Sequence, residues 1–150
     1  MYKLVNDELK VFIAHPGGPF WKDKNEGAWS ITKGEPNEEE DDLLKVAIRE
    51  FKEETGIDAS RKEFIELGSA QQKSGKIVHC WAFEGDWSGL LMCSTYVNLE
   101  FPSHSKKFIK FPEIDRAGFF NFEEAKKKIN PAQIAFLERL EVKLQTPSAQ

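Results

Sequence analysis

Residues 33–57 read KGEPNEEEDDLLKVAIREFKEETGI, and the second half of this segment places Glu53 and Glu54 three and four positions after Glu50. In an α-helix this spacing gathers the three carboxylates on one face. Because like charges at such spacings cost roughly a few tenths of a kcal/mol each, the cluster indicates a cation between them. Carboxylate oxygens suit hard divalent ions, so we expect Mg²⁺, or alternatively Mn²⁺. An acidic helix face that is simply solvated is the other interpretation.

The predicted helix has clear ends. Asp41 or Asp42 is the expected N-cap, and Gly56 is the expected C-terminal stop. Between these ends, a stripe of apolar side chains is expected to face the core: Leu44, Ala47, Ile48 and Phe51. Gly34 opens the segment, as expected of a loop that folds back towards the acidic face. The acids are therefore expected on a helix that the core holds in place.

Length and composition predict one α+β domain that spans residues 1–150, with 40% hydrophobic and 31% charged residues. The formal net charge of −4 argues against general nucleic-acid binding through a basic face. Cys80 and Cys93 lack CxxC spacing and follow no signal-like start, so we expect free thiols and a cytoplasmic location. No apolar run approaches ~18 residues, so no membrane span is expected. We expect a monomer or a homodimer.

Upstream of the acidic helix, residues 9–14 (LKVFIA) predict a buried strand, and residues 15–29 (HPGGPFWKDKNEGAW) predict a long aromatic loop. Candidate stacking faces for a nucleobase are Phe20, Trp21 and Trp29. Candidate contacts to phosphate oxygens are His15, Lys22 and Lys24. The alternative places the tryptophans in the core and makes His15 a turn or packing residue.

Downstream, residues 63–72 and 76–83 predict a hairpin whose second strand, KIVHCWAF, lies mid-sheet with both faces covered. An extended segment begins at residues 98–101. A basic segment, SHSKKFIK, follows it, in which Lys107 is a candidate for steering a polyphosphate and a solvated loop is the alternative. Further along, Asn121 is the expected N-cap of a helix that follows a strand, and Pro131 is the expected start of a final helix. This order of elements predicts a mixed sheet between helices.

The acidic segment resembles the signature of the Nudix hydrolases. The matching residues are Arg49, Glu50, Phe51, Glu53, Glu54, Gly56 and Ile57. Gly34 stands one residue further from Arg49 than the signature has it, so the loop carries one extra position. Glu40 keeps the glycine spacing of the early acid, whereas Asp41 keeps its helical register with Arg49, and we favour Asp41. The segments HPGGPFW, AWSITKGE and FPEIDR are similar to a bacterial subgroup of predicted nucleoside-triphosphate pyrophosphohydrolases.

This resemblance implies a Nudix fold, an α/β/α sandwich in which the signature forms a loop-helix-loop. It implies hydrolysis of a nucleoside diphosphate linked to another group, with magnesium held by Glu50, Glu53 and Glu54. Arg49 would support the site by pairing with the early acid, and Lys33 and Gly34 would lie beside the substrate. A further acidic ligand or base is expected at Glu113, which stands six residues before Phe119, as in diadenosine tetraphosphate hydrolases. Glu100 is the alternative to Glu113.

The Nudix signature does not specify the substrate, so the indications come from residues outside it. The segment WSITKGE is similar to the Trp-x-x-Pro-Lys-Gly of diadenosine tetraphosphate hydrolases, with Thr32 in place of proline. This favours a dinucleoside polyphosphate or a nucleoside triphosphate. An oxidised nucleotide, a nucleotide sugar and a capped RNA end stay open. A nucleotide-binding module of Nudix fold without hydrolysis is the opposing hypothesis, against which the three intact glutamates argue.

Overall fold

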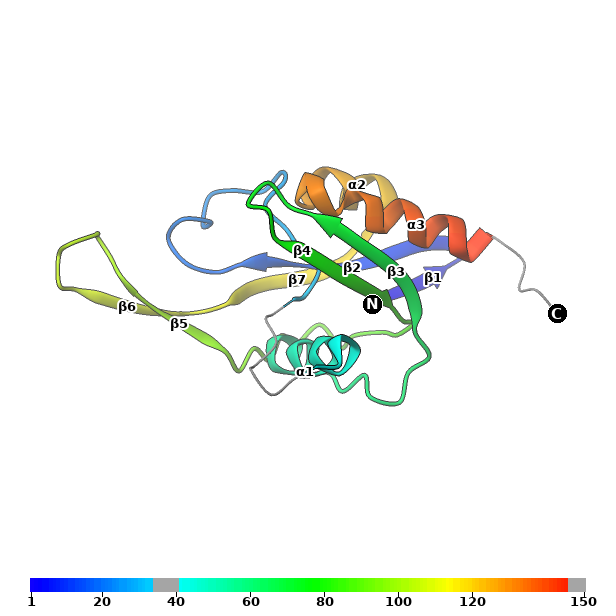
Figure 1. The fold of residues 1–150 in the computed structure, drawn as a ribbon, viewed down its shortest axis with the longest axis horizontal. Coiled ribbons are helices and arrows are strands. Elements are labelled where there is room, and N and C mark those ends of the chain that lie inside the picture. Colours follow the sequence, from blue (N-terminus) through cyan, green and yellow to red (C-terminus); the bar gives the residue numbers. More distant parts are fainter. Residues whose placement is uncertain (34–40, 146–150) are drawn as a thin grey trace.

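The computed structural model describes residues 1–33 and 41–145. Its strands lie between helix α1 (Leu43–Thr55) on one side and helices α2 (Phe122–Lys128) and α3 (Ile134–Gln145) on the other, as Figure 1 shows. A short 3-10 helix, η1 (Pro131–Gln133), leads into α3. The predicted α+β sandwich is therefore confirmed. In the described ranges, no helix is both long enough and apolar enough to cross a membrane.

The central sheet consists of β1 (Tyr2–Val5), β2 (Glu8–Pro16) and β7 (Ile114–Asn121), antiparallel and in the order β1-β2-β7. Sequence analysis predicted β2 and β7 but missed β1. The missed signal is the Asn-Asp pair between the strands, which takes φ angles of 51° and 63° as a two-residue hairpin turn requires. Parallel bridges from Tyr2 to Glu84 and from Trp29 to Ile129 give the strand layer its mixed character.

The predicted hairpin is present as β3 (Ile65–Gln71) and β4 (Ile77–Ala82). The prediction that its second strand lies mid-sheet is wrong, because β4 belongs to a two-stranded sheet and alternates in burial. Ile77 and His79 are exposed, whereas Val78 and Cys80 are buried. The alternation was obscured in the sequence because an apolar isoleucine occupies an exposed position.

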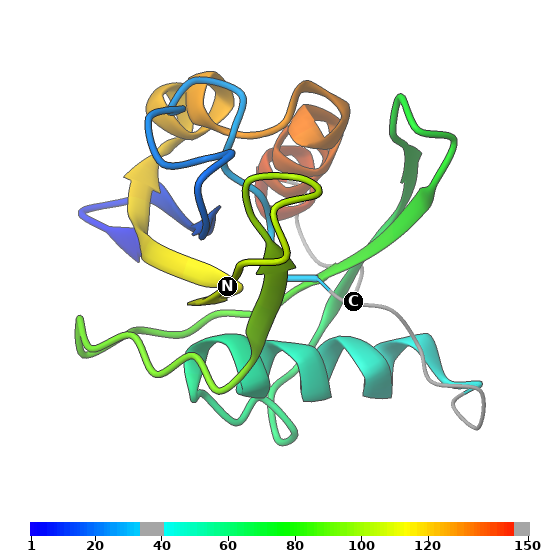
Figure 2. The same ribbon diagram turned by 90° about the vertical axis from the view of Figure 1, so that its left-hand side faces the viewer.

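A third hairpin, which we call the arm, consists of β5 (Tyr96–Glu100) and β6 (Phe108–Pro112). It projects from the body in Figure 1, and Figure 2 looks onto it end-on. Sequence analysis expected β5 but treated the start of β6 as part of a basic loop. Val97 and Leu99 pair with Phe111 and Ile109, so these four apolar side chains share one face of the arm.

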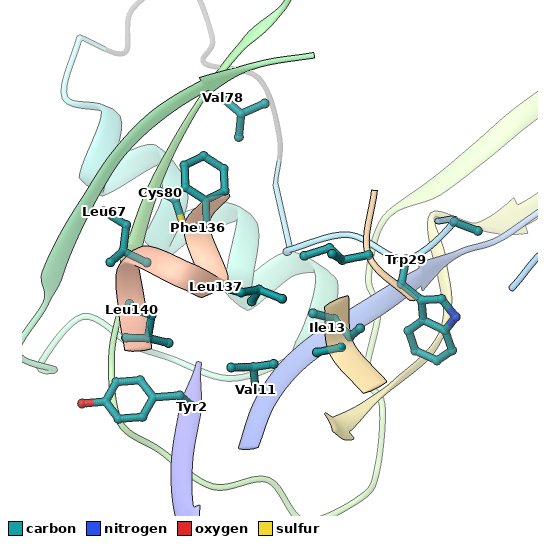
Figure 3. Packing of buried hydrophobic residues seen from close by; sticks show 14 residues of the cluster. Tyr2, Val11, Ile13, Trp29, Leu67, Val78, Cys80, Phe136, Leu137 and Leu140 are labelled. Carbon is teal, nitrogen blue, oxygen red and sulfur yellow. The ribbon is translucent and has the colours of Figure 1, made fainter. Parts of the chain in front are cut away.

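Two hydrophobic clusters hold the layers together. In the larger cluster, α3 places Phe136, Leu137 and Leu140 among the side chains of β2, β3 and β4 (Figure 3). In the smaller one, Phe51 of α1 packs against Phe12, with ring centroids 6.1 Å apart, and against Phe83, 5.2 Å apart. Helix α1 is therefore fixed to the strand layer through its C-terminal half, where the acidic residues also lie.

Candidate active site

Helix α1 begins and ends as the sequence predicted. The Asp42 side chain accepts hydrogen bonds from the backbone N–H groups of Leu44 and Lys45, at 3.1 and 3.3 Å. Gly56 ends the helix in the left-handed conformation, with φ 82°, and its N–H donates to the Lys52 carbonyl at 2.7 Å. These caps and the buried Phe51 fix the rotation of the helix, so the carboxylates next to Phe51 have a defined direction.

Glu54 is buried, with 4% of its surface exposed. Its pKa is raised from 4.5 to about 9, first by burial and then by the charges of Glu113 and Glu50, while a hydrogen bond from the backbone N–H of Lys33 acts in the opposite direction. Within residues 1–33 and 41–145, its buried Oε2 atom has no hydrogen-bond partner. Glu54 therefore holds a proton at neutral pH unless another cation takes its place.

Arg49 binds the other two carboxylates of the helix. Its Nη1 donates to Glu50 Oε1 at 3.0 Å and to both carboxylate oxygens of Glu53, at 3.1 and 3.2 Å. Burial raises the pKa of Glu50, and the Arg49 charge opposes that rise. The pairing of Arg49 with an early acid stays a prediction, because Glu40 lies outside the described residues. The other candidate, Asp41, is exposed beside the helix cap.

Glu113, between β6 and β7, is held by two other segments of the chain. Its N–H donates to the Thr95 carbonyl at 3.0 Å, and Thr95 Oγ1 donates to its carboxylate at 3.1 Å. Its carbonyl accepts from the Gly17 N–H at 2.9 Å. Since its charge acts on Glu54, the fold brings these two acids together. The alternative, Glu100, instead accepts a hydrogen bond from the His104 N–H at the tip of the arm.

A pocket of about 360 Å³ opens beside Glu54 and Glu113. We call residues 17–28 the aromatic loop, and the pocket is lined by residues of this loop, of the arm and of the end of α1. Phe20 of the loop meets Phe101 at the end of β5 edge-to-face, with ring centroids 5.8 Å apart. The pocket is also lined by Trp21, Lys33, Val97, Leu99 and Phe111. The pocket thus joins acidic groups, a lysine and an apolar, aromatic wall.

Two predicted substrate contacts are corrected. Trp29 is only 5% exposed, and its indole N–H donates to Asn25 Oδ1 at 2.8 Å, so it is a core residue rather than a stacking face. His15 is fully buried and bonded through both ring nitrogens, so it cannot meet a phosphate. In both cases the alternative interpretation, a packing role, describes the structure. The sequence signal was ambiguous because aromatic residues serve both purposes.

Other predicted residues fall in different places. Trp21, Lys33, Glu54 and Glu113 meet at the pocket. Lys107 lies in the turn at the tip of the arm. Gly34 lies outside the described residues.

The arm side chains were not identified as site residues from the sequence. The available signal was the alternation in YVNLE and FIKFP, which predicts two short strands with one apolar face. Pairing of these strands puts Val97, Leu99 and Phe111 on the pocket wall.

The predicted metal ligands, Glu50, Glu53, Glu54 and Glu113, were tested against this geometry. Among the residues that the structure describes, no three His, Cys, Asp or Glu side chains are gathered so that they could hold a metal ion. Arg49 accounts for two of the four carboxylates. The donor chemistry nevertheless fits a hard divalent cation, because Glu54 has a buried oxygen without a hydrogen-bond partner among the described residues, and the charges of Glu113 and Glu50 act on its carboxyl group.

Comparisons with known proteins agree with this geometry. A family model described as the NUDIX domain matches residues 2–140. A structure described as a binary complex of C. elegans Ap4A hydrolase is similar with a TM-score of 0.66 and 19% identity, over 95% of this chain and 91% of that chain. The NUDIX domain of Shewanella oneidensis NrtR, complexed with ADP ribose, gives a TM-score of 0.65 and 11% identity, over 96% and 83%. The structure of the MutT protein from Methanosarcina mazei Go1 gives a TM-score of 0.55 and 16% identity, over 96% of this chain and 90% of that chain. No curated protein sequence matches the chain.

Proposed function

Because this chain belongs to the Nudix family, we propose that it hydrolyses the phosphoric anhydride of a nucleoside diphosphate linked to another group, with a divalent cation. The observation that carries this proposal is the pocket in which the Glu54 and Glu113 carboxylates meet an aromatic wall. Pure nucleotide binding would not require a buried carboxyl group with one oxygen that has no hydrogen-bond partner in the part of the chain that the structure describes, under the influence of two other acids. Such an arrangement is costly without a cation and suits an enzyme that uses one.

The residues at the pocket would have different roles in this reaction. Glu54 and Glu113 would hold the cation, with Glu50 and Glu53 joining them when Arg49 releases their oxygens. A bound divalent cation would neutralise charge on the diphosphate and make a water molecule easier to deprotonate. Lys33, on the pocket wall, would face the substrate phosphates. The apolar face of the arm would limit the access of bulk water.

For the substrate we propose a dinucleoside polyphosphate or a nucleoside triphosphate. Support comes from Phe20 and Trp21, which are exposed and line the pocket, so each offers a ring for a nucleobase. The Lys24 ammonium lies 5.0 Å from the centre of the Trp21 ring and covers one of its faces, which leaves the other face for stacking. The all-oxygen ligand set suits Mg²⁺, and Mn²⁺ is also compatible with it.

A substrate panel tests this function. The protein is incubated with Mg²⁺ and diadenosine tetraphosphate, nucleoside triphosphates, ADP-ribose and nucleotide sugars, and the products are identified by chromatography. We expect diadenosine tetraphosphate to give ATP and AMP, or a triphosphate to give a monophosphate and pyrophosphate. Binding without cleavage of any compound would support the non-hydrolytic alternative and contradict the enzyme.

Replacing Trp21 tests the aromatic wall. We expect Trp21→Ala to raise KM for the preferred nucleotide by about tenfold, because stacking of one base on an aromatic side chain contributes ~1–3 kcal/mol. Phe108→Ala is the control, since Phe108 is also an exposed aromatic residue but lies on β6 outside the pocket lining. Equal effects of the two substitutions on KM would argue against stacking on Trp21.

A further inference from the structure

His15, at the end of β2, is a polar side chain with no exposed surface. Its Nε2 lies 2.7 Å from the Lys24 carbonyl oxygen, and its Nδ1 lies 2.8 Å from Asp115 Oδ1. Each ring nitrogen therefore has an oxygen partner within hydrogen-bond distance. The ring also packs edge-to-face on Trp29, with centroids 5.3 Å apart. The imidazole is thus a fixed connection between the sheet and the aromatic loop.

The part of the loop that His15 holds is the part that lines the pocket. Within the described chain, the other backbone hydrogen bonds of residues 18–24 are local turns, from Trp21 N–H to Gly18 O and from Lys24 N–H to Trp21 O. These turns shape residues 18–24 but do not attach them to the body. The aromatic loop is attached near its ends by the Gly17 N–H, which donates to the Glu113 carbonyl, and by the Gly27 N–H, which donates to the Lys127 carbonyl. Between these two attachments, the His15 bond to the Lys24 carbonyl joins the loop to β2, and Phe20 and Trp21 lie within the segment that this bond closes.

The hydrogen bond between His15 and Asp115 also ties the aromatic loop to the strand next to Glu113, at the acidic end of the pocket. Asp115 lies two residues after Glu113 on the strand that β2 pairs with, and the Gly17 N–H donates to the Glu113 carbonyl. The loop can approach so closely because Gly17 and Gly18 lack side chains, since a Cβ at either position would overlap Pro112 or Phe111. The aromatic wall and Glu113 are therefore anchored to the same short segment.

We propose that His15 is a positioning residue that sets the affinity of the pocket for the planar base of its ligand, by holding Phe20 and Trp21 at a fixed place relative to Glu113. The inference rests on the proposed function for the location of the base. His15 itself does not contact the ligand in this proposal. Loss of the connection releases the aromatic wall and leaves the phosphate-binding end intact.

Calorimetric titration with ADP and with pyrophosphate tests this role, because the two probes share the diphosphate and differ in the nucleoside. We expect His15→Phe, which keeps a ring of similar size, to weaken ADP binding by about tenfold and pyrophosphate binding by less than about twofold, the loss expected for a stacking contact. His79→Gln, on the exposed face of β4, should leave both affinities unchanged. With the preferred substrate, KM should rise while kcat at saturation is retained.

Asp115→Ala provides a second route if the His15 variant does not fold, since the Asp115 side chain is 35% exposed. We expect it to weaken ADP binding about threefold alone and to add nothing in the His15→Phe background, because it acts through the imidazole. Equal losses for ADP and pyrophosphate would overturn the proposal by showing general damage, as would unchanged ADP binding in both variants. If the wild-type protein binds ADP but cleaves no substrate, the proposed hydrolysis fails while this inference is still decided by the titrations.

Discussion

Glu54→Gln lowers the rate of substrate hydrolysis by about 100- to 10,000-fold, the range that loss of a group handling a proton or a cation typically produces. Glutamine has nearly the same shape but cannot carry the negative charge that a divalent cation requires. Glu54 is the most buried acid of α1 and lies on the pocket wall, so water cannot easily replace its oxygen. Steady-state kinetics with the preferred substrate over a range of Mg²⁺ concentrations measures the effect.

Two further variants show whether the loss of activity in Glu54→Gln is specific to the proposed cation site. Glu138→Gln makes the same chemical change on the exposed side of α3 and should keep full activity. Glu53→Gln should also reduce activity, although Glu53 is bound by Arg49 in this structure. Hydrolysis that survives both Glu53→Gln and Glu54→Gln would refute the proposed cation site.

The contribution of Glu54 to the free energy of unfolding, measured in the presence of a metal chelator, decreases as the pH rises from about 4.5 to about 9. Burial, together with the charges of Glu113 and Glu50, raises the pKa of Glu54 from 4.5 to about 9, so across this window the folded state keeps a proton that the unfolded state releases. The unfolded state then binds fewer protons, and linkage makes stability fall with increasing pH. Chemical unfolding at several pH values, with wild type and Glu54→Gln in parallel, isolates this contribution as the difference between them.

The substitution should flatten the decrease in stability, because glutamine has no proton to release. Added Mg²⁺ should stabilise the wild-type protein more at pH 9 than at pH 6, because at pH 6 the cation must first displace the proton. Parallel stability curves for wild type and Glu54→Gln would show that the buried carboxyl does not titrate in this window.

Much of the local structure could be predicted from the sequence. The ends of α1 depend on Asp42 and Gly56, whose preferences are local, and the hairpin of β3 and β4 depends on a nearby turn. Predictions failed where the sequence pattern was only a few residues long or was compatible with more than one kind of structure. The two-residue turn before β2 was missed with β1, and β6 was hidden because lysines surround its start.

For the site, the sequence by itself determined the acidic helix and the residue types around it, since helical spacing and capping act over a few residues. The tertiary structure decided which of those residues meet. It put Glu113 beside Glu54, turned Trp21 outwards and Trp29 inwards, and made the arm a wall of the pocket. These outcomes depend on strand pairing and packing between segments far apart in the chain. An aromatic residue has the same intrinsic preferences in the core as on a pocket wall, so only its neighbours in space decide its role.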